Sequence, residues 1–552
     1  MKKDFAFPNP LQRAELSHPR RKWKYILGVA VALTLLVIFL PNLLSSKIGR
    51  NLIKMRLESK YRGQVWVTDW RTRWFGPTDI DKFSLTDGQG RQIRFQHLSS
   101  PIGLWQLLFG KLDLKDATIT GLYVEYVVDY GDGTTTLDRL PQGASPPPLV
   151  GYPQAARRAP VELPAISGHI KLNDGTLVLT RGQIELRDQL RTVYRSLRLS
   201  GISGTLDIAS LDQPWQCDLT GIFGSDDSPG QFRLAGSFAL GQNKKLDLTR
   251  GMANAQLTML DVPNVPSFGT SPLGWLFFPD FAPEDYGVMF GPKLRQVDTI
   301  IKLTNGKLRL DPLKIEGQLA DGRTSKLIAR PVIDLTVTPS VLSLDGELVA
   351  SLPMSRGLAK RFAFVNPFVH NASGGTGQVD VKLENLTLPL ATGNLIRKIS
   401  LQGWAAMHGV IVTSGQSAHD YELPRELTTQ WQAIVGDASP MPKVSAPEIR
   451  FTVRDGIVSC EPYQITIDDQ AVSLSGRARL AGPLEMQAEL SLPAVTAQPI
   501  KVAIGGTVDN PSMQIPPNSP LTEVITRNMA TLRARRMEHL MRMSEAQVRE
   551  ML

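Results

Sequence analysis

Side chains that commonly do chemistry are scattered along this 552-residue chain without a converging motif. Two carboxylate pairs, Asp226-Asp227 and Asp468-Asp469, are the strongest metal-site candidates. Both pairs stand beside turn residues, where solvated Asp is common. Residues 129–133 match a calcium-binding loop only in part, because the further ligands and the closing Glu are missing. We therefore expect no metal site and no other cofactor.

Histidines, cysteines and nucleotide-binding motifs add no stronger signal. No two of the seven histidines have metal-binding spacing. Cys217 and Cys460 would form a disulfide in an oxidising compartment only if the fold brought them together. The chain has no Gly-x-Ser-x-Gly elbow, P-loop or Rossmann fingerprint. The sequence predicts that this protein is not an enzyme. We expect ordinary strand or loop positions for His97, His169, His370, His408 and His419.

Positive charge is concentrated at the N-terminus. The net charge is +9, but much of it comes from Lys and Arg residues before residue 25. Nucleic-acid-binding proteins usually carry a basic patch on the folded body instead. We therefore expect no nucleic-acid partner.

An uncharged apolar run over residues 25–44 follows this basic tail and is long enough to cross a bilayer core. A cleaved signal peptide is the alternative, but Pro41-Asn42-Leu43-Leu44 offers no small-residue cleavage site. Basic residues flank the run on both sides, so the positive-inside rule does not decide the orientation. A short tail and a long remainder favour the tail inside and the body outside. We predict a cytoplasmic tail over residues 1–24, one transmembrane helix over 25–44, and nearly all remaining mass on the other side.

A second helix is predicted directly after this span. Ile48, Leu52 and Met55 recur at helical spacing among basic residues, which predicts an amphipathic helix over residues 45–60. Such a helix can lie on the membrane surface. It can equally cover the end of the sheet that follows.

From Gly63 onward, apolar and polar residues alternate, which is typical of antiparallel strands with one buried and one solvated face. The chain lacks the strand–helix rhythm of doubly wound and barrel folds. We predict a mostly β protein built on a long antiparallel sheet. Candidates for its apolar face are Leu303, Leu308, Leu310, Ile315, Leu319, Val472, Leu474, Leu480, Met486, Leu490 and Leu492.

A short unit recurs within this body, over residues 172–177, 303–308 and 453–458. Each copy places Asp-Gly or Asn-Gly between two apolar residues. These dipeptides favour the type I′ turn of a two-residue hairpin. The three copies predict three hairpins and a body that grew by repetition.

Three segments depart from the alternation. Residues 141–164 are rich in proline and predict a linker. Residues 262–292 combine aromatics with proline, and such a loop would be an aggregation hazard unless it covered a groove mouth, a membrane or a partner. We favour a lid. Ser519 and Pro520 predict the start of an amphipathic helix over residues 518–552. The lid candidates are Phe268, Trp275, Phe277, Phe278 and Phe281.

The order of these features resembles the AsmA-like family of inner-membrane-anchored envelope proteins. The N-terminal resemblance rests on the motifs at residues 63–67, 74–77, 83–87, 107–112 and 117–121. The C-terminal resemblance rests on those at 454–457, 473–476, 499–502 and 505–511. It implies an AsmA-like unit over residues 45–140 and a curled antiparallel sheet with an apolar groove over 165–517. It also implies an inner-membrane anchor, a periplasmic body, and membrane lipids and other envelope proteins as partners.

Larger relatives in that family resemble bridge-like lipid-transfer proteins, and its founding member is linked to outer-membrane assembly. The resemblance thus implies a groove that binds or conducts lipid for outer-membrane biogenesis or homeostasis. The alternating strands also fit a sheet packed shut as a sandwich, which would act as an anchored scaffold or assembly factor through protein contacts. Both interpretations remain open from the sequence.

Overall fold

The computed structural model describes residues 40–528, apart from 43, 61–62, 88–91, 105, 107–111, 130–165, 183, 187–188, 192–194, 224–229, 244, 248, 264–288, 338–339, 373–376, 390–397, 413–426, 436–440, 481, 493–497 and 509. The predicted cytoplasmic tail, most of the predicted span, the linker and all five lid candidates lie outside the described residues. So do residues 529–552 of the predicted C-terminal helix. Among the described residues, no helix is long and apolar enough to span a membrane.

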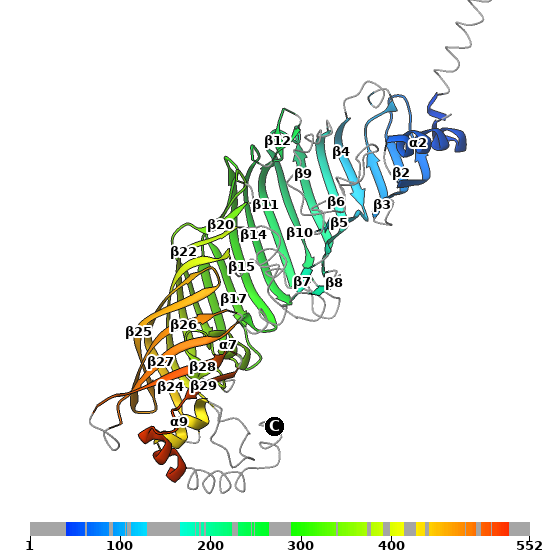
Figure 1. Ribbon diagram of the computed structural model, residues 1–552. Helices are drawn as coiled ribbons and strands as arrows, with labels where there is room; N and C mark the ends of the chain where they lie inside the picture. The colour runs from blue at the N-terminus through cyan, green and yellow to red at the C-terminus, as the bar shows by residue number, and fades with distance from the viewer. Residues whose placement is uncertain are drawn as a thin grey trace, which may run out of the picture.

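One curled sheet of 25 strands dominates the described part of the chain and gives it an elongated shape (Figure 1). The prediction of a mostly β protein with a long sheet is therefore confirmed. The N-terminal section of the chain contains β1 (Gly63–Arg71), β2 (Thr78–Asp87), β3 (Gln92–Ser100), β4 (Leu112–Thr120), β5 (Tyr123–Asp129), β6 (Ile166–Gly182), β7 (Ile184–Leu186), β8 (Gln189–Arg191), β9 (Arg195–Ile208), β10 (Trp215–Phe223), β11 (Gly230–Ala239), β12 (Gly241–Gln242), β13 (Lys245–Leu246) and β14 (Met252–Pro263).

The C-terminal section contains β15 (Lys293–Thr304), β16 (Lys307–Leu310), β17 (Leu313–Gln318), β18 (Thr324–Ala329), β19 (Pro331–Asp334), β20 (Val341–Leu344), β21 (Leu348–Pro353), β22 (Gln378–Pro389), β23 (Ser400–Ile411), β24 (Lys443–Arg454), β25 (Ile457–Ile467), β26 (Gln470–Arg479), β27 (Leu484–Leu490), β28 (Ile500–Thr507) and β29 (Asn510–Gln514). The named helices are α2 (Lys47–Lys60), α7 (Arg356–Phe362), the 3₁₀ helix η1 (Pro367–Val369) and α9 (Leu427–Val435). Residues 520–528 are also helical, and the Leu521 N–H donates to Ser519 Oγ at 3.3 Å. This agrees with the predicted helix start.

The strands follow one another across the sheet almost in chain order. Most neighbours are antiparallel, as in the meander from β22 to β29. The exception is β6, which runs parallel to β4 and to β5. A parallel pair cannot be joined by a tight hairpin and needs a longer crossover. The segment predicted as a linker, residues 141–164, falls within this crossover.

Two of the three predicted hairpins are confirmed. Asn305-Gly306 joins β15 to β16, and Asp455-Gly456 joins β24 to β25, with positive φ at all four residues as the type I′ turn requires. The prediction over residues 172–177 is wrong, because β6 runs straight through them. Asp174 has a φ of 54°, and the β6–β9 pairing shifts between Leu172 and Gly175. The same dipeptide chemistry therefore forms a bulge here instead of a turn.

Helix α2 packs beside β1. Figure 1 shows it at the N-terminal end of the sheet. The Val65 N–H of β1 donates to Glu58 Oε1 at 3.0 Å, and Arg50 donates to the carbonyl of Thr68. These side chains occupy backbone groups of an edge strand, which would otherwise be open to pairing. The helix thus covers the end of the sheet, one of the two predicted interpretations. The apolar residues Ile48, Leu52 and Met55 nevertheless remain exposed.

Candidate functional site

An apolar row of leucines crosses the N-terminal section of the sheet on one face, here called the inner face. In the strand register, Leu172 of β6 lies opposite Gly204 of β9, which in turn faces Leu219 of β10. Leu219 is paired with Leu234 of β11, which is paired with Leu257 of β14. We call Leu172, Leu219, Leu234 and Leu257 the leucine row. It runs across the strands, because residues paired in register share one face of a sheet.

Neighbouring rows on the inner face are also apolar. One of them joins Phe232, Met259, Val297 and Ile315 through paired positions on β11, β14, β15 and β17. All four side chains are buried. Phe232 also meets Phe223 edge to face, with ring centroids 5.2 Å apart. The row brings the sequence-predicted candidate Ile315 onto the same face as the leucine row.

The opposite, outer face of the same strands is mainly polar, although Met252 and Leu260 of β14 are also exposed on it. Asp218 and Arg233 form an ion pair on it at 2.9 Å, and Gln216 and Gln256 are exposed there. The guanidinium of Arg233 lowers the pKa of Asp218 by its hydrogen bond, against a smaller desolvation effect. The inner face of these strands is therefore the more continuous apolar surface.

The leucine row is incompletely covered by the described residues. Leu219, Leu234 and Leu257 are only half-buried, as are Leu177, Leu179 and Leu199 nearby. The described strands from β2 to β14 pack chiefly against their neighbours within the sheet. The described helices lie elsewhere, with α2 at the N-terminal end and α7 and α9 in the C-terminal section (Figure 1). The inner face therefore offers partly exposed leucine side chains across successive strands.

The inner face of β26 and β27, in the C-terminal section, is sealed. Val472, Leu474 and Leu490 are 0% exposed, and Met486 is 3% exposed. They alternate with exposed or half-buried residues along β26 and β27, so the predicted face is right. These four sequence-predicted candidates are packed within a continuous hydrophobic core, and so is Leu492. Their contact with an acyl chain stays a prediction.

Part of the cover in this section is residues 354–372, here called the plug, which include α7 and η1. Tyr463 of β25 donates to the Val365 carbonyl, and Phe368 meets Trp431 of α9 edge to face at 5.9 Å. Burial raises the pKa of Tyr463 well above its ordinary value, so it remains a neutral donor. Buried plug residues are Met354, Leu358, Ala359, Ala363, Val365, Asn366, Pro367, Phe368, Val369 and Ala372.

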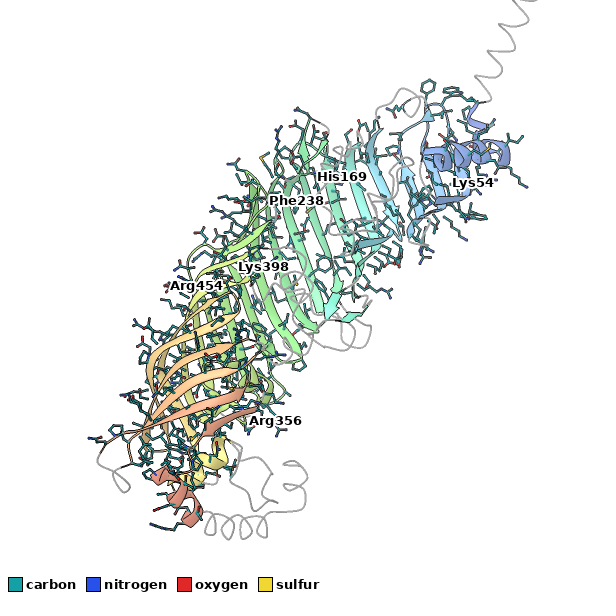
Figure 2. All side chains as sticks on the ribbon, viewed as in Figure 1. Lys54, His169, Phe238, Arg356, Lys398 and Arg454 are labelled. Atoms are coloured by element: carbon teal, nitrogen blue, oxygen red, sulfur yellow. The ribbon has the colours of Figure 1, made fainter. Side chains whose placement is uncertain are left out.

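One arginine links the first residue of the plug to Gly377, just before β22. Arg323 Nη2 donates to the Met354 carbonyl and its Nη1 to the Gly377 carbonyl, both at 3.1 Å. The Nε of Arg323 also donates to Asp321 Oδ2 at 2.8 Å. Figure 2 marks the plug with Arg356, far along the molecule from Lys54 on α2. The inner face is thus sealed at β26 and β27 but partly open along the leucine row, although both belong to one sheet.

The remaining sequence-predicted candidates belong neither to the leucine row nor to the sealed face of β26 and β27. Leu303 and Leu308 face each other beside the hairpin turn, where Leu303 is buried and Leu308 half-buried. Leu310, Leu319 and Leu480 are also half-buried. The lid candidates Phe268, Trp275, Phe277, Phe278 and Phe281 lie outside the described residues. Sequence reasoning missed the leucine row, although the alternation in β10, β11 and β14 carries the same signal.

The described polar side chains form pairs and small networks; Asp380, for example, accepts from Ser351 and Gln378. His97 contacts Asp81 at 2.7 Å, and His408 contacts Asp380 at 3.2 Å. Asp468-Asp469 forms the turn between β25 and β26, as its solvated-turn interpretation predicts. Within the described ranges, no group of three or more His, Cys, Asp or Glu side chains is placed to hold a metal ion.

Both cysteines are buried and free, on β10 and β25 respectively. Burial raises the pKa of the Cys460 thiol to about 12 and also raises that of Cys217. Both thiols are thus shielded and held in the protonated, unreactive form at neutral pH.

This chain matches no protein-family model, no curated protein and no solved structure.

Proposed function

We propose that this chain is a membrane-anchored periplasmic protein that binds or conducts lipid along the inner face of its sheet. It would serve outer-membrane biogenesis or homeostasis from an inner-membrane anchor at residues 25–44. The observation that carries the proposal is the half-buried state of Leu219, Leu234 and Leu257 on successive strands. Uncovered apolar surface is unfavourable in water, so a ligand with apolar chains would stabilise it.

The direction of the leucine row supports a chain-like ligand. Strands in a sheet lie about 4.8 Å apart, so the positions from β6 to β14 span roughly 19 Å. This approaches the length of an extended acyl chain. The polar outer face is unsuited to the same ligand, because burying its ions would carry a desolvation cost.

The resemblance to the AsmA-like family supports the membrane and envelope parts of the proposal. The motifs that carry this resemblance follow one another along the chain in the same order as in that family. The family is described as having a curled apolar groove. We propose membrane lipids and other envelope proteins as partners. Binding requires no converging catalytic groups, so we propose no enzymatic activity.

A second candidate is an anchored scaffold or assembly factor that acts through protein contacts. It is favoured by the sealed inner face of β26 and β27, where Leu474 and Leu490 have no exposed surface. A sheet that is packed shut there can present its polar outer face to proteins. The two candidates differ in what touches the leucine row.

Site-specific photocrosslinking distinguishes them. A benzophenone amino acid at Leu219 or Leu257 of the full-length protein in native membranes should yield lipid adducts, detected by mass spectrometry. The matched controls are Thr220 and Gln256, which lie next to these sites on the outer face. Lipid adducts at Leu219 but not at Thr220 support the groove. Protein adducts alone at Leu219, or equal lipid adducts at all four sites, contradict it.

A further inference from the structure

The exposed side of α2 is unusually apolar. Ile48, Leu52 and Met55 are 64%, 49% and 57% exposed. Successive residues of an α-helix are rotated by about 100°, so positions 48, 52 and 55 form one narrow stripe. We call these three residues the α2 stripe. Isolated apolar residues on a surface are ordinary, but a stripe on one helix marks an interaction surface.

The α2 stripe points away from the sheet. Arg50 and Leu57 lie on the opposite side of the helix and Glu58 on its flank. Arg50 and Glu58 contact β1. The apolar stripe is therefore not used to pack α2 against β1. One side of α2 thus faces β1, and the side with the α2 stripe is free to contact a partner.

Charge and position indicate what that cover is. Helix α2 contains Lys47, Arg50, Lys54, Arg56 and Lys60 but only one acidic residue, Glu58. A helix with an apolar stripe among basic residues suits the interface of an anionic bilayer. The helix also comes directly after residues 25–44, the proposed membrane anchor.

An aromatic residue lies at the same end of the molecule. Phe75 is 87% exposed in the loop between β1 and β2. The Thr72 N–H in this loop donates to Ser45 Oγ at 3.3 Å, so the loop meets the chain where it approaches α2. Aromatic rings are favoured at the headgroup level of a bilayer.

We propose that the α2 stripe and Phe75 form one membrane-binding surface that holds the sheet edge-on to the bilayer. Because α2 lies alongside β1, this contact sets the strands roughly parallel to the membrane plane. The leucine row, which crosses the strands, then leads away from the membrane. Figure 1 shows the sheet extending from α2 toward β29 in that direction.

This inference rests on the proposed membrane anchor but not on lipid binding by the leucine row. Its test uses full-length protein in nanodiscs of phosphatidylethanolamine and phosphatidylglycerol. Single substitutions Leu52→Cys, Phe75→Cys and Ile328→Cys receive an environment-sensitive fluorophore. The buried native thiols of Cys217 and Cys460 leave the introduced thiol as the reactive one. Ile328 on β18 is the matched control, since its 47% exposure is close to that of Leu52.

Lipids that carry a spin label near the headgroup should quench the fluorophores at positions 52 and 75 several-fold more than the one at 328. Aqueous iodide should show the reverse order. Protein that enters nanodiscs without preferential lipid quenching at both 52 and 75 overturns this inference and leaves the anchor standing. Equal lipid quenching at all three positions also overturns it, because the body would then lie along the membrane. Failure to enter nanodiscs would refute both the anchor and the inference.

Discussion

The side-chain amide of Gln430 forms two hydrogen bonds with the backbone of Met513, as a neighbouring strand would. Gln430 Oε1 accepts from the Met513 N–H at 2.7 Å, and Gln430 Nε2 donates to the Met513 carbonyl at 3.2 Å. Both residues are buried, and Met513 lies on β29, the last strand of the sheet. At the other edge, Glu58 and Arg50 bind backbone groups of β1. Side chains from helices thus occupy backbone groups at both edges, where strands of other chains would otherwise add.

Replacing Gln430 by Met should destabilise the C-terminal section. The change introduces an apolar side chain of similar size and leaves the Met513 N–H and carbonyl buried without their partner. Each unsatisfied group costs about 1–3 kcal/mol, and the free energy of unfolding should fall accordingly. Chemical denaturation in detergent measures the loss. Gln514→Met, at an exposed position on the same strand, is the control and should change stability little.

A charge on the inner face should have different effects in the two sections. Leu474→Asp places a carboxylate in a fully sealed core, which costs several kcal/mol, so the C-terminal section should lose its fold. Leu257→Asp adds the charge to a half-buried position, where water can reach it, so the sheet should fold but bind less lipid. Circular dichroism and lipid mass spectrometry of the purified proteins separate the two effects.

The polar substitution Ser473→Asn serves as the control for Leu474→Asp, because Ser473 alternates with the buried face of β26. It should leave both fold and lipid content unchanged. Equal damage from Ser473→Asn and Leu474→Asp would show that both faces of β26 are buried. Unfolding by Leu257→Asp as severe as that by Leu474→Asp would contradict the difference in cover.

Arg323→Gln should loosen the plug without unfolding the sheet. The shorter amide cannot reach both the Met354 and the Gly377 carbonyls, so the start of the plug loses its link to Gly377. Limited proteolysis should then cut near residues 354–377 faster than in the unmodified protein. Arg309→Gln removes an exposed ion pair with Asp345 and should leave the cleavage rate unchanged. A similar acceleration in both variants would assign the effect to general destabilisation.

His169 should titrate above its ordinary pKa of 6.5. The main cause is its hydrogen bond to Asp207, with a further charge attraction between them. The stabilising contact of protonated His169 is fully present below pH 6.5 and is lost as the pH rises through the raised pKa. Histidine resonances followed by NMR against pH measure this value. Asp207→Asn should lower it toward 6.5, whereas an unchanged value would identify a different cause.

Several features of the fold were predictable from local patterns. The even-numbered residues Val472 and Leu474 are buried because alternation in a strand selects one face whatever the partner is. The turns at Asn305-Gly306 and Asp455-Gly456 follow from the ease with which these residues adopt positive φ. The same reasoning failed at Asp174-Gly175. There the pairing of β6 with β9 continues past the dipeptide, and only long-range contacts can decide between a bulge and a turn.

The sequence alone determined that this protein has a long sheet with one apolar face, because hydrophobic period and turn residues act locally. It could not determine how that face is covered. Leu219 and Leu474 both look like inward-facing leucines in alternating strands, yet one is half-buried and the other is fully sealed. The difference comes from how the sheet curls and from where the plug and α9 pack. Burial depends on segments distant in the chain, so only the tertiary structure decided which leucines remain open to a ligand.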